Sequence, residues 1–131
     1  MAFEFLRAEN SASPIEKELL ATSGTTYKHG AAIKYGDAGT AALASGTTKP
    51  EYIYVGKDVT AAAGDKIACI PVQPNIEFVT EFKAAGTSLK EGEKVTISSD
   101  SLGVTATKTS GVFQLLEPGK ASGATIRGRF V

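Results

Sequence analysis

Few side chains in this chain could do covalent chemistry, and their spacing does not bring them together. His29 is the one histidine and Cys69 the one cysteine among 131 residues, so a Ser-His-Asp triad would depend wholly on His29. An intrachain disulfide cannot form. His29 stands in "YKHGAA", a segment typical of a turn, where we expect a solvated side chain. Cys69 lies in the apolar run "KIACIPV", which favours a small buried hydrophobe over a nucleophile.

The carboxylates do not define a site either. Glu77 and Glu81 share one face of an expected strand, and such a pair can do acid/base work. No aromatic or glycine-rich segment frames a cleft around them, so we expect a solvated strand face. The aspartates are scattered through turns without the spacing of a calcium loop. One histidine and one cysteine do not make a zinc site.

A glycine-lysine segment, "PGKAS" at 118–122, is similar to part of a phosphate-binding loop but lacks its required residues. Position 114 is Gln instead of Gly, and Ala121 stands where Ser or Thr would bind magnesium. The sequence therefore predicts no catalytic residue, no metal site and no cofactor, and we expect that the chain is not an enzyme. A small hydrolase that depends on His29 or on the Glu77/Glu81 pair is the weakest alternative.

Charge and hydropathy limit the partners. Fourteen basic and fourteen acidic residues give zero formal charge, whereas nucleic-acid binding needs a basic face. The local excess at Lys120, Arg127 and Arg129 is typical of a solvated strand face. No apolar run approaches the ~20 residues of a membrane span, and "MAFEFLRAEN" lacks the pattern of a secretory signal. We therefore expect neither a nucleic-acid nor a membrane partner, and synthesis in the cytosol.

The chain contains an internal repeat. "AAGDKIACIPV" from Ala62 aligns with "ASGATIRGRFV" from Ala121, 59 residues later, and "KHGAAI" at 28–33 resembles "KEGEKV" at 90–95. The matches keep their order along the chain, as two diverged copies at about 28–72 and 90–131 would. Residues 73–89 would then form a linking strand between them.

Within the copies, apolar residues alternate with polar ones at the spacing of half-buried strands. "KIACIPV" and "YIYV" (52–55) are apolar on both faces and are expected to be covered on both. Thr96 and Ser98 are expected on an outer face. The sequence thus predicts an all-β domain over 28–131, a small barrel or sandwich. The side chains expected on inner faces are Ile76, Phe78, Phe82, Val95, Ile97, Ile126, Gly128 and Phe130.

Residues 1–27 differ in character and are predicted to form an N-terminal arm. Ser13, Pro14 and Glu16 make a capping-box pattern, which predicts a short helix with Ile15 and Leu19 on one face. The apolar residues of the arm either cover one end of the β domain or reach a neighbouring subunit. The thin, alanine-rich core slightly favours the second interpretation.

This layout resembles a family of small virion proteins from tailed bacteriophages. The resemblance rests on an opening "MAFEFLRAENSASPIEKELLA", a Gly/Ala/Thr-rich β module with "GVF" at Gly111–Phe113, and a terminal "SGATIRGRFV". The family is the head decoration, or cement, proteins. It implies a structural protein on the capsid exterior, without catalysis or cofactor. Its partners would be the major capsid protein and further copies of itself, in a trimer or another homo-oligomer.

On this interpretation the arm carries the contacts. We expect it to bridge neighbouring capsid subunits and so stabilise the shell, either through its side chains or by adding a strand to a neighbour's sheet. The alternative is a free-standing carbohydrate- or surface-binding module of a virion fibre, for which Tyr27, Tyr35 and Tyr52 are weak candidate platform residues. The expected capsid-binding residues are Phe3, Phe5, Leu6, Arg7, Ile15, Leu19 and Leu20.

Overall fold

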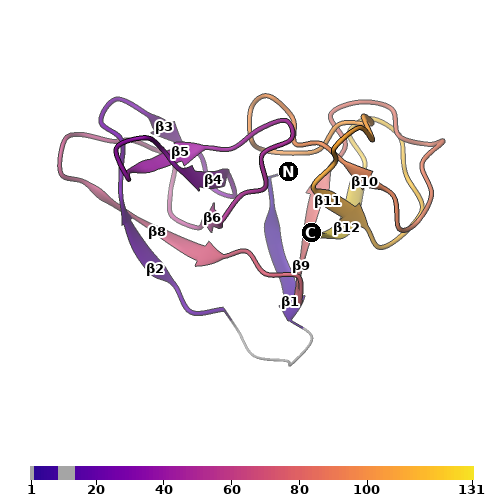
Figure 1. Cartoon of the computed structure of the whole chain (residues 1–131), viewed down its shortest axis with the longest axis horizontal. Coiled ribbons are helices and arrows are strands. Elements are labelled where there is room, and N and C mark those ends of the chain that lie inside the picture. The colour runs from indigo at the N-terminus through magenta and orange to yellow at the C-terminus, as the bar shows by residue number, and fades with distance from the viewer. Residues whose placement is uncertain (1, 9–13) are drawn as a thin grey trace.

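The computed structural model describes residues 2–8 and 14–131, and over these ranges the chain forms strands and loops without a helix (Figure 1). The all-β prediction is therefore confirmed. The strands are β1 (Glu4–Ala8), β2 (Lys17–Leu20), β3 (Thr26–Tyr27), β4 (Ala32–Tyr35), β5 (Ala41–Leu43), β6 (Tyr52–Tyr54), β7 (Val59–Thr60), β8 (Lys66–Pro71), β9 (Ile76–Glu81), β10 (Lys94–Val95), β11 (Phe113–Leu115) and β12 (Thr125–Phe130).

The described strands make two five-stranded antiparallel sheets in a sandwich-like arrangement. One sheet has the order β1-β9-β12-β11-β10 and the other the order β2-β8-β6-β4-β5, while β3 and β7 form a small third sheet. In Figure 1 the strands from β2 to β8 occupy the left of the molecule and β9 to β12 the right. The N-terminal strand β1 lies beside β9, its partner, although most of the chain separates them in sequence.

The two sheets share a strand order. Strands β9, β12, β11 and β10 follow one another in the first sheet as β2, β8, β6 and β4 do in the second. Strands β8 and β12 begin and end 59 residues apart, which is the offset at which the two similar sequence segments align. The matching pattern begins at β2 and β9, so we call residues 17–72 the first half and residues 76–131 the second half.

Backbone hydrogen bonds outside the strand ladders recur at equivalent positions in the two halves. The N–H of Ala21 donates to the backbone carbonyl of Asp65 at 2.9 Å. In the same way the N–H of Phe82 donates to the backbone carbonyl of Ala124 at 3.0 Å. Each of these turns contains a glycine with φ of +85°, Gly64 in the first half and Gly123 in the second. This conformation favours glycine because it has no Cβ. Further matched donor–acceptor pairs are Gly30–Tyr54 with Gly92–Leu115, Val55–Ala68 with Leu116–Arg127, and Val72–Glu51 with Val131–Val112.

Two hydrophobic cores result. The smaller core belongs to the first half and packs Ile33, Tyr54, Ile67 and Cys69 together with Tyr27. The larger core combines the inner face of the second half with residues of the first half, and we call it the shared core. It contains Phe3, Ala32, Ala44, Ile53, Ile70, Ile76, Phe78, Phe82, Val95, Ile97, Val104, Phe113, Leu115, Ile126 and Phe130, among others.

The shared core confirms the expected inner faces in the second half, where Ile76, Phe78, Ile126 and Phe130 are buried. The prediction that β8 is covered on both faces is also confirmed, because its Ile67 faces one core and its Ile70 the other. Placing Thr96 and Ser98 on an outer face was wrong. Both are buried, and their hydroxyls are satisfied locally, Thr96 by Thr105 at 2.7 Å and Ser98 by Asp100 at 2.6 Å.

The predicted N-terminal helix is also wrong. Pro14 to Glu16 have no regular structure and Lys17–Leu20 form a strand paired with β8, while Ser13, the expected cap, lies outside the described residues. A helix of one or two turns is marginal without packing. A strand in the same place gains the hydrogen bonds of β8 and buries Leu19 in the smaller core. Tertiary pairing therefore overrides the local capping pattern.

Phe3 fixes β1 to the rest of the molecule. Its side chain is 1% exposed, and its ring lies 5.6 Å from that of Phe113 and 5.1 Å from that of Phe130. Its N–H donates to the carbonyl of Gly30 in the first half at 3.0 Å. Phe3 thus joins both halves, and the N-terminal segment belongs to the fold.

This burial predicts a sharp contrast between two neighbouring phenylalanines. Phe3→Ala should lower the free energy of unfolding by about 3–5 kcal/mol, because it removes a ring from a closed core. Phe5→Ala is the matched control, and as Phe5 is partly exposed it should cost about 1 kcal/mol or less. Urea unfolding of both variants measures the difference. Equal losses would contradict the placement of Phe3.

Candidate docking surface

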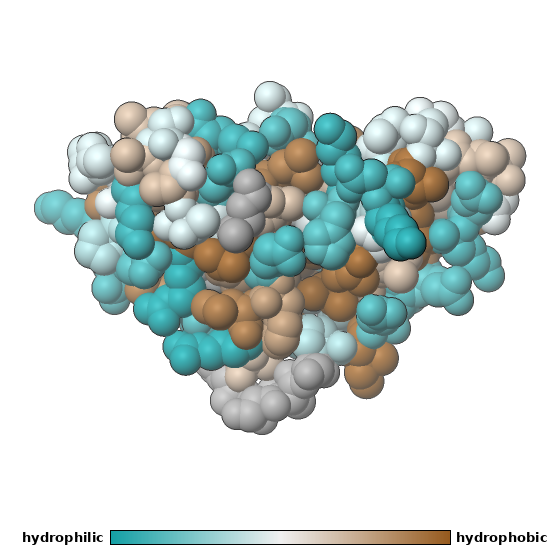
Figure 2. All heavy atoms as spheres, turned by 180° about the vertical axis from the view of Figure 1, so that it is seen from behind, coloured by the Kyte–Doolittle hydropathy of each residue, from teal (hydrophilic) through white to brown (hydrophobic). Residues whose placement is uncertain are grey.

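The residues expected to bind a capsid fall into two groups. Phe3 and Leu19 are buried and stabilise this chain's own cores. The remaining five are exposed and lie on or beside two edge strands, β1 and β2. They are Phe5, Leu6, Arg7, Ile15 and Leu20. Figure 2, which views the molecule from behind, shows apolar side chains gathered in the lower middle of that face among polar ones.

Ile15 is the most exposed of these side chains, at 85%. A large aliphatic side chain left almost wholly in water forgoes about 1.5–3 kcal/mol of burial free energy. Scattered exposed apolar residues are normal on a protein surface. Here four of them, Phe5, Leu6, Ile15 and Leu20, lie on short edge strands or beside them, where a partner strand would cover them.

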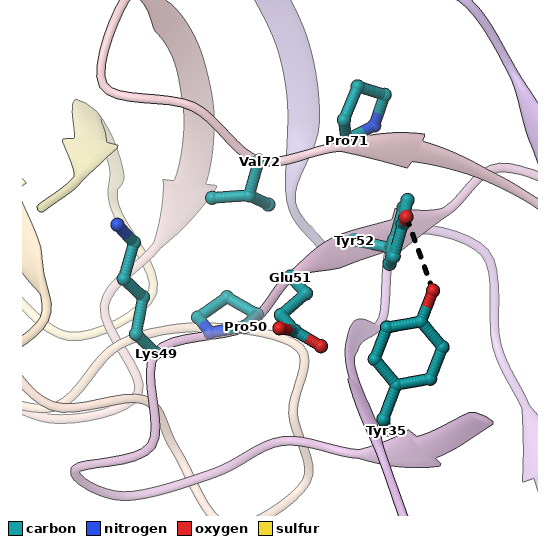
Figure 3. A pocket seen from close by; sticks show the side chains of 7 residues that line it. All are labelled: Tyr35, Lys49, Pro50, Glu51, Tyr52, Pro71 and Val72. Atoms are coloured by element: carbon teal, nitrogen blue, oxygen red, sulfur yellow. Dashed lines mark hydrogen bonds between the residues drawn. The ribbon is translucent and has the colours of Figure 1, made fainter. Parts of the chain in front are cut away.

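A hollow of about 450 Å³ opens next to β6 and the end of β8 (Figure 3). Tyr35 and Tyr52 form one wall, with ring centroids 5.9 Å apart and nearly perpendicular planes. The Tyr35 hydroxyl donates to the Tyr52 hydroxyl at 3.3 Å. Pro71 and Val72 lie on the side of β8, and Lys49, Pro50 and Glu51 complete the lining.

Lys17 of β2 lies at this hollow, with its Nζ 5.8 Å from the centroid of the Tyr52 ring. Hydrogen bonding to the Tyr52 hydroxyl, together with the nearby tyrosines, raises the pKa of Lys17. The hydrogen bond to Tyr52 likewise raises the pKa of Tyr35. The hollow therefore combines aromatic faces with charged side chains, the ammonium groups of Lys17 and Lys49 and the carboxylate of Glu51.

The side chains weighed for catalysis lie apart. Burial raises the pKa of the Cys69 thiol to about 12, so Cys69 is a buried small hydrophobe as expected. Glu77 pairs with Arg7 at 3.1 Å. The Lys83 ammonium, 2.8 Å from Glu81, lowers the pKa of the Glu81 carboxyl. Each carboxylate is thus held by its own cation.

Within residues 2–8 and 14–131, no three or more His, Cys, Asp and Glu side chains gather into a group that could hold a metal ion. The same residues contain no helix of the length and hydropathy needed to cross a bilayer. No protein-family model matches the chain, and no curated protein is detectably similar to it.

Sequence reasoning found the exposed residues of this surface but missed the hollow. Tyr35 and Tyr52 were considered only as separate platform residues, together with Tyr27, which is fully buried in the smaller core. The alternating "YIY" pattern of β6 offered one signal, since a tyrosine on a covered strand tends to keep its hydroxyl wet. The juxtaposition with Tyr35 and Pro71 depends on register between strands, which one sequence does not provide.

His29 ties β1 to the loop after β6 and makes stability depend on pH. Its Nδ1 lies 3.0 Å from the Gly56 carbonyl and its Nε2 3.4 Å from Glu4. The Gly56 carbonyl, followed by Glu4, raises the pKa of His29 above its usual 6.5. The stabilisation is therefore fully present below pH 6.5 and lost as pH rises through the raised pKa.

We predict that His29→Gln lowers the free energy of unfolding at about pH 5.5 but not at about pH 8.5, by roughly 0.5 kcal/mol or less, because the ring is half exposed and screened by solvent. Lys28→Gln, at the neighbouring exposed position, is the control and should show no such pH dependence. Urea unfolding at both pH values tests this. A loss of equal size at the two values would disprove the assigned role of the imidazolium.

Proposed function

We propose that this chain is a structural virion protein that binds the outside of a tailed-phage capsid and stabilises it by bridging neighbouring major capsid subunits. The observation that carries the proposal is the set of exposed apolar side chains that lie on β1, on β2 and just before β2. These side chains take no part in the two hydrophobic cores, so they are available to a partner. Cys69 is buried, and Glu77 and Glu81 are each paired with a cation. These surroundings support a binding role over a catalytic one.

We further propose that the two halves are diverged tandem copies of one β unit. The shared strand order and the recurring backbone hydrogen bonds support this origin. A doubled unit with two different outer edges suits a bridging protein, because β1 and β2 lie at the edges of separate sheets and can contact different subunits. Modest contacts then multiply through avidity when they are made many times over one shell.

Point variants test this better than a truncation, because removing β1 would also remove Phe3 from the shared core. The double variant Phe5→Ser, Leu6→Ser should weaken co-sedimentation with undecorated heads at least about tenfold, since burying the exposed parts of both side chains would together contribute about 1.4 kcal/mol or more. Leu43→Ser, Val59→Ser changes two apolar residues that are also exposed but lie elsewhere, and it should bind as the unaltered chain does.

The heads used must come from a phage whose genome encodes the chain, and unfolding curves must show that both double variants are fully folded under the binding conditions. Heads carrying the protein should also resist heat better than bare heads. If the unaltered chain does not sediment with such heads, the proposed function fails. If both double variants bind equally well, the β1 surface is not the contact.

A second candidate function is supported by the Tyr35–Tyr52 pair. Two tyrosines beside a hollow are a plausible platform for a sugar ring, as in a carbohydrate-binding module of a virion fibre. This candidate predicts hits on a glycan array that Tyr35→Ala abolishes, while Phe5→Ser leaves them unchanged. An array without hits, alongside co-sedimentation with heads, would eliminate it.

A further inference from the structure

The two halves differ in whether one equivalent strand has a partner on its outer edge. Strand β9 pairs with β12 on one side and with β1 on the other, whereas β2 pairs with β8 and, among the described strands, has no partner on its other side. Since β2 and β9 hold the same place in their sheets, β1 occupies in the second half a position that the first half leaves open.

The residues of the two edges correspond one to one. Lys17 pairs with Cys69 as Phe78 pairs with Gly128, and this register sets Ile15 against Ile76 and Glu16 against Glu77, identical residues in both cases. Their surroundings are opposite. Ile76 is 3% exposed and belongs to the shared core, whereas Ile15 is almost fully exposed. Glu77 holds Arg7 of β1 at 3.1 Å, whereas Glu16 is exposed.

The backbone of β2 is oriented to accept a strand. The N–H of Ala21 donates to Asp65 of the adjoining turn, and in an antiparallel ladder such residues alternate with residues that face the other way. Glu18 therefore directs its N–H and carbonyl away from β8. Its counterpart Val79 faces β1 and pairs with Glu4.

The hollow beside Tyr52 corresponds to the place that Phe3 fills in the second half. Phe3 packs on Phe113 and Phe130, which lie opposite each other in β11 and β12. The equivalent opposed pair in the first half is Tyr52 and Pro71, and both line the hollow (Figure 3). The side chain that would complete this site by analogy is therefore a large apolar one.

We propose that the outer edge of β2 and the Tyr35–Tyr52–Pro71 hollow together bind an extended segment of another protein, which adds as an antiparallel strand, places a large apolar side chain in the hollow and sets a basic side chain four residues later against Glu16. The spacing copies Phe3 and Arg7 of β1. Strand addition supplies the affinity through backbone hydrogen bonds, and the two side chains supply register. Only the identification of this segment as part of the capsid subunit rests on the proposed function.

A second copy of the chain is a poorer occupant. Its own β1 is already paired with β9 and anchored by Phe3 in the shared core. Moving that strand to a neighbour's β2 would open one edge for each edge it closes, so the number of paired edges would not rise. A segment from a different protein closes the β2 edge without this loss.

The chain's own β1 sequence provides the probe. A capped peptide of residues 2–8, AFEFLRA, titrated into the full-length ¹⁵N-labelled protein, should shift the amides of Ile15–Leu20, Tyr35 and Tyr52. Glu18→Pro removes the outward N–H without removing a hydrogen bond to β8 and should abolish the shifts. Glu16→Lys should weaken binding about two- to fivefold, and a peptide carrying Arg→Glu at its basic position should recover that loss.

Glu91→Lys is the matched control, because Glu91 is exposed in the second half, away from β2, and should bind the peptide unchanged. The absence of binding at millimolar peptide would overturn the proposal. Shifts at Glu77–Val79 in place of Glu16–Glu18 would mean that the peptide exchanges with β1, and would overturn it as well. The titration contains no capsid, so its failure is distinguishable from failure of the co-sedimentation test.

Discussion

An edge strand carries backbone N–H and C=O groups that only another strand or water can satisfy, and this constraint organises the molecule. In the second half the chain meets it internally, because β1 pairs with β9 and Phe3 holds β1 in place through the shared core. In the first half no described strand lies along the outer edge of β2, although Ala21, directly after β2, bridges Ala41 of β5. The exposed Ile15 and Leu20 and the tyrosine hollow lie next to this edge of β2.

The shared core explains why two halves with the same strand order differ in sequence. In the first half β8 lies between two cores, so Ile70 is buried where the second half has Arg129 at the equivalent position of β12. In the same way Ile53 of β6 is buried, whereas its counterpart Gln114 faces outward and donates to the Gly92 carbonyl at 3.2 Å. The second face of the first half is apolar where it packs against the second half.

These differences between equivalent positions of the two halves also limit what could be predicted from the sequence alone. Alternation identified the inner faces of β9 and β12, and the 59-residue offset aligned β8 with β12, because these signals are local or repeated. The predicted copies begin at about 28 and 90 and leave out β2 and β9, because Lys17–Leu20 and Ile76–Glu81 share few identities. The helix was predicted from Ser13, Pro14 and Glu16 because a capping pattern is visible locally, whereas pairing with β8 is not.

The hollow of the first half and the place that Phe3 fills in the second half are lined by different residues. These differences suit the hollow to being unoccupied part of the time. The second half lines its site with Phe78, Phe113 and Phe130, all buried, and a vacant site of that kind would expose a large apolar patch and invite aggregation. In the first half their places are taken by Lys17, Tyr52 and Pro71. The tyrosine hydroxyl and the ammonium remain hydrated while the ring and the aliphatic stem still offer apolar surface. Lysine at an edge strand also discourages indiscriminate strand pairing, so the same residues that keep the empty site soluble make it selective for a segment with the right anchor and charge.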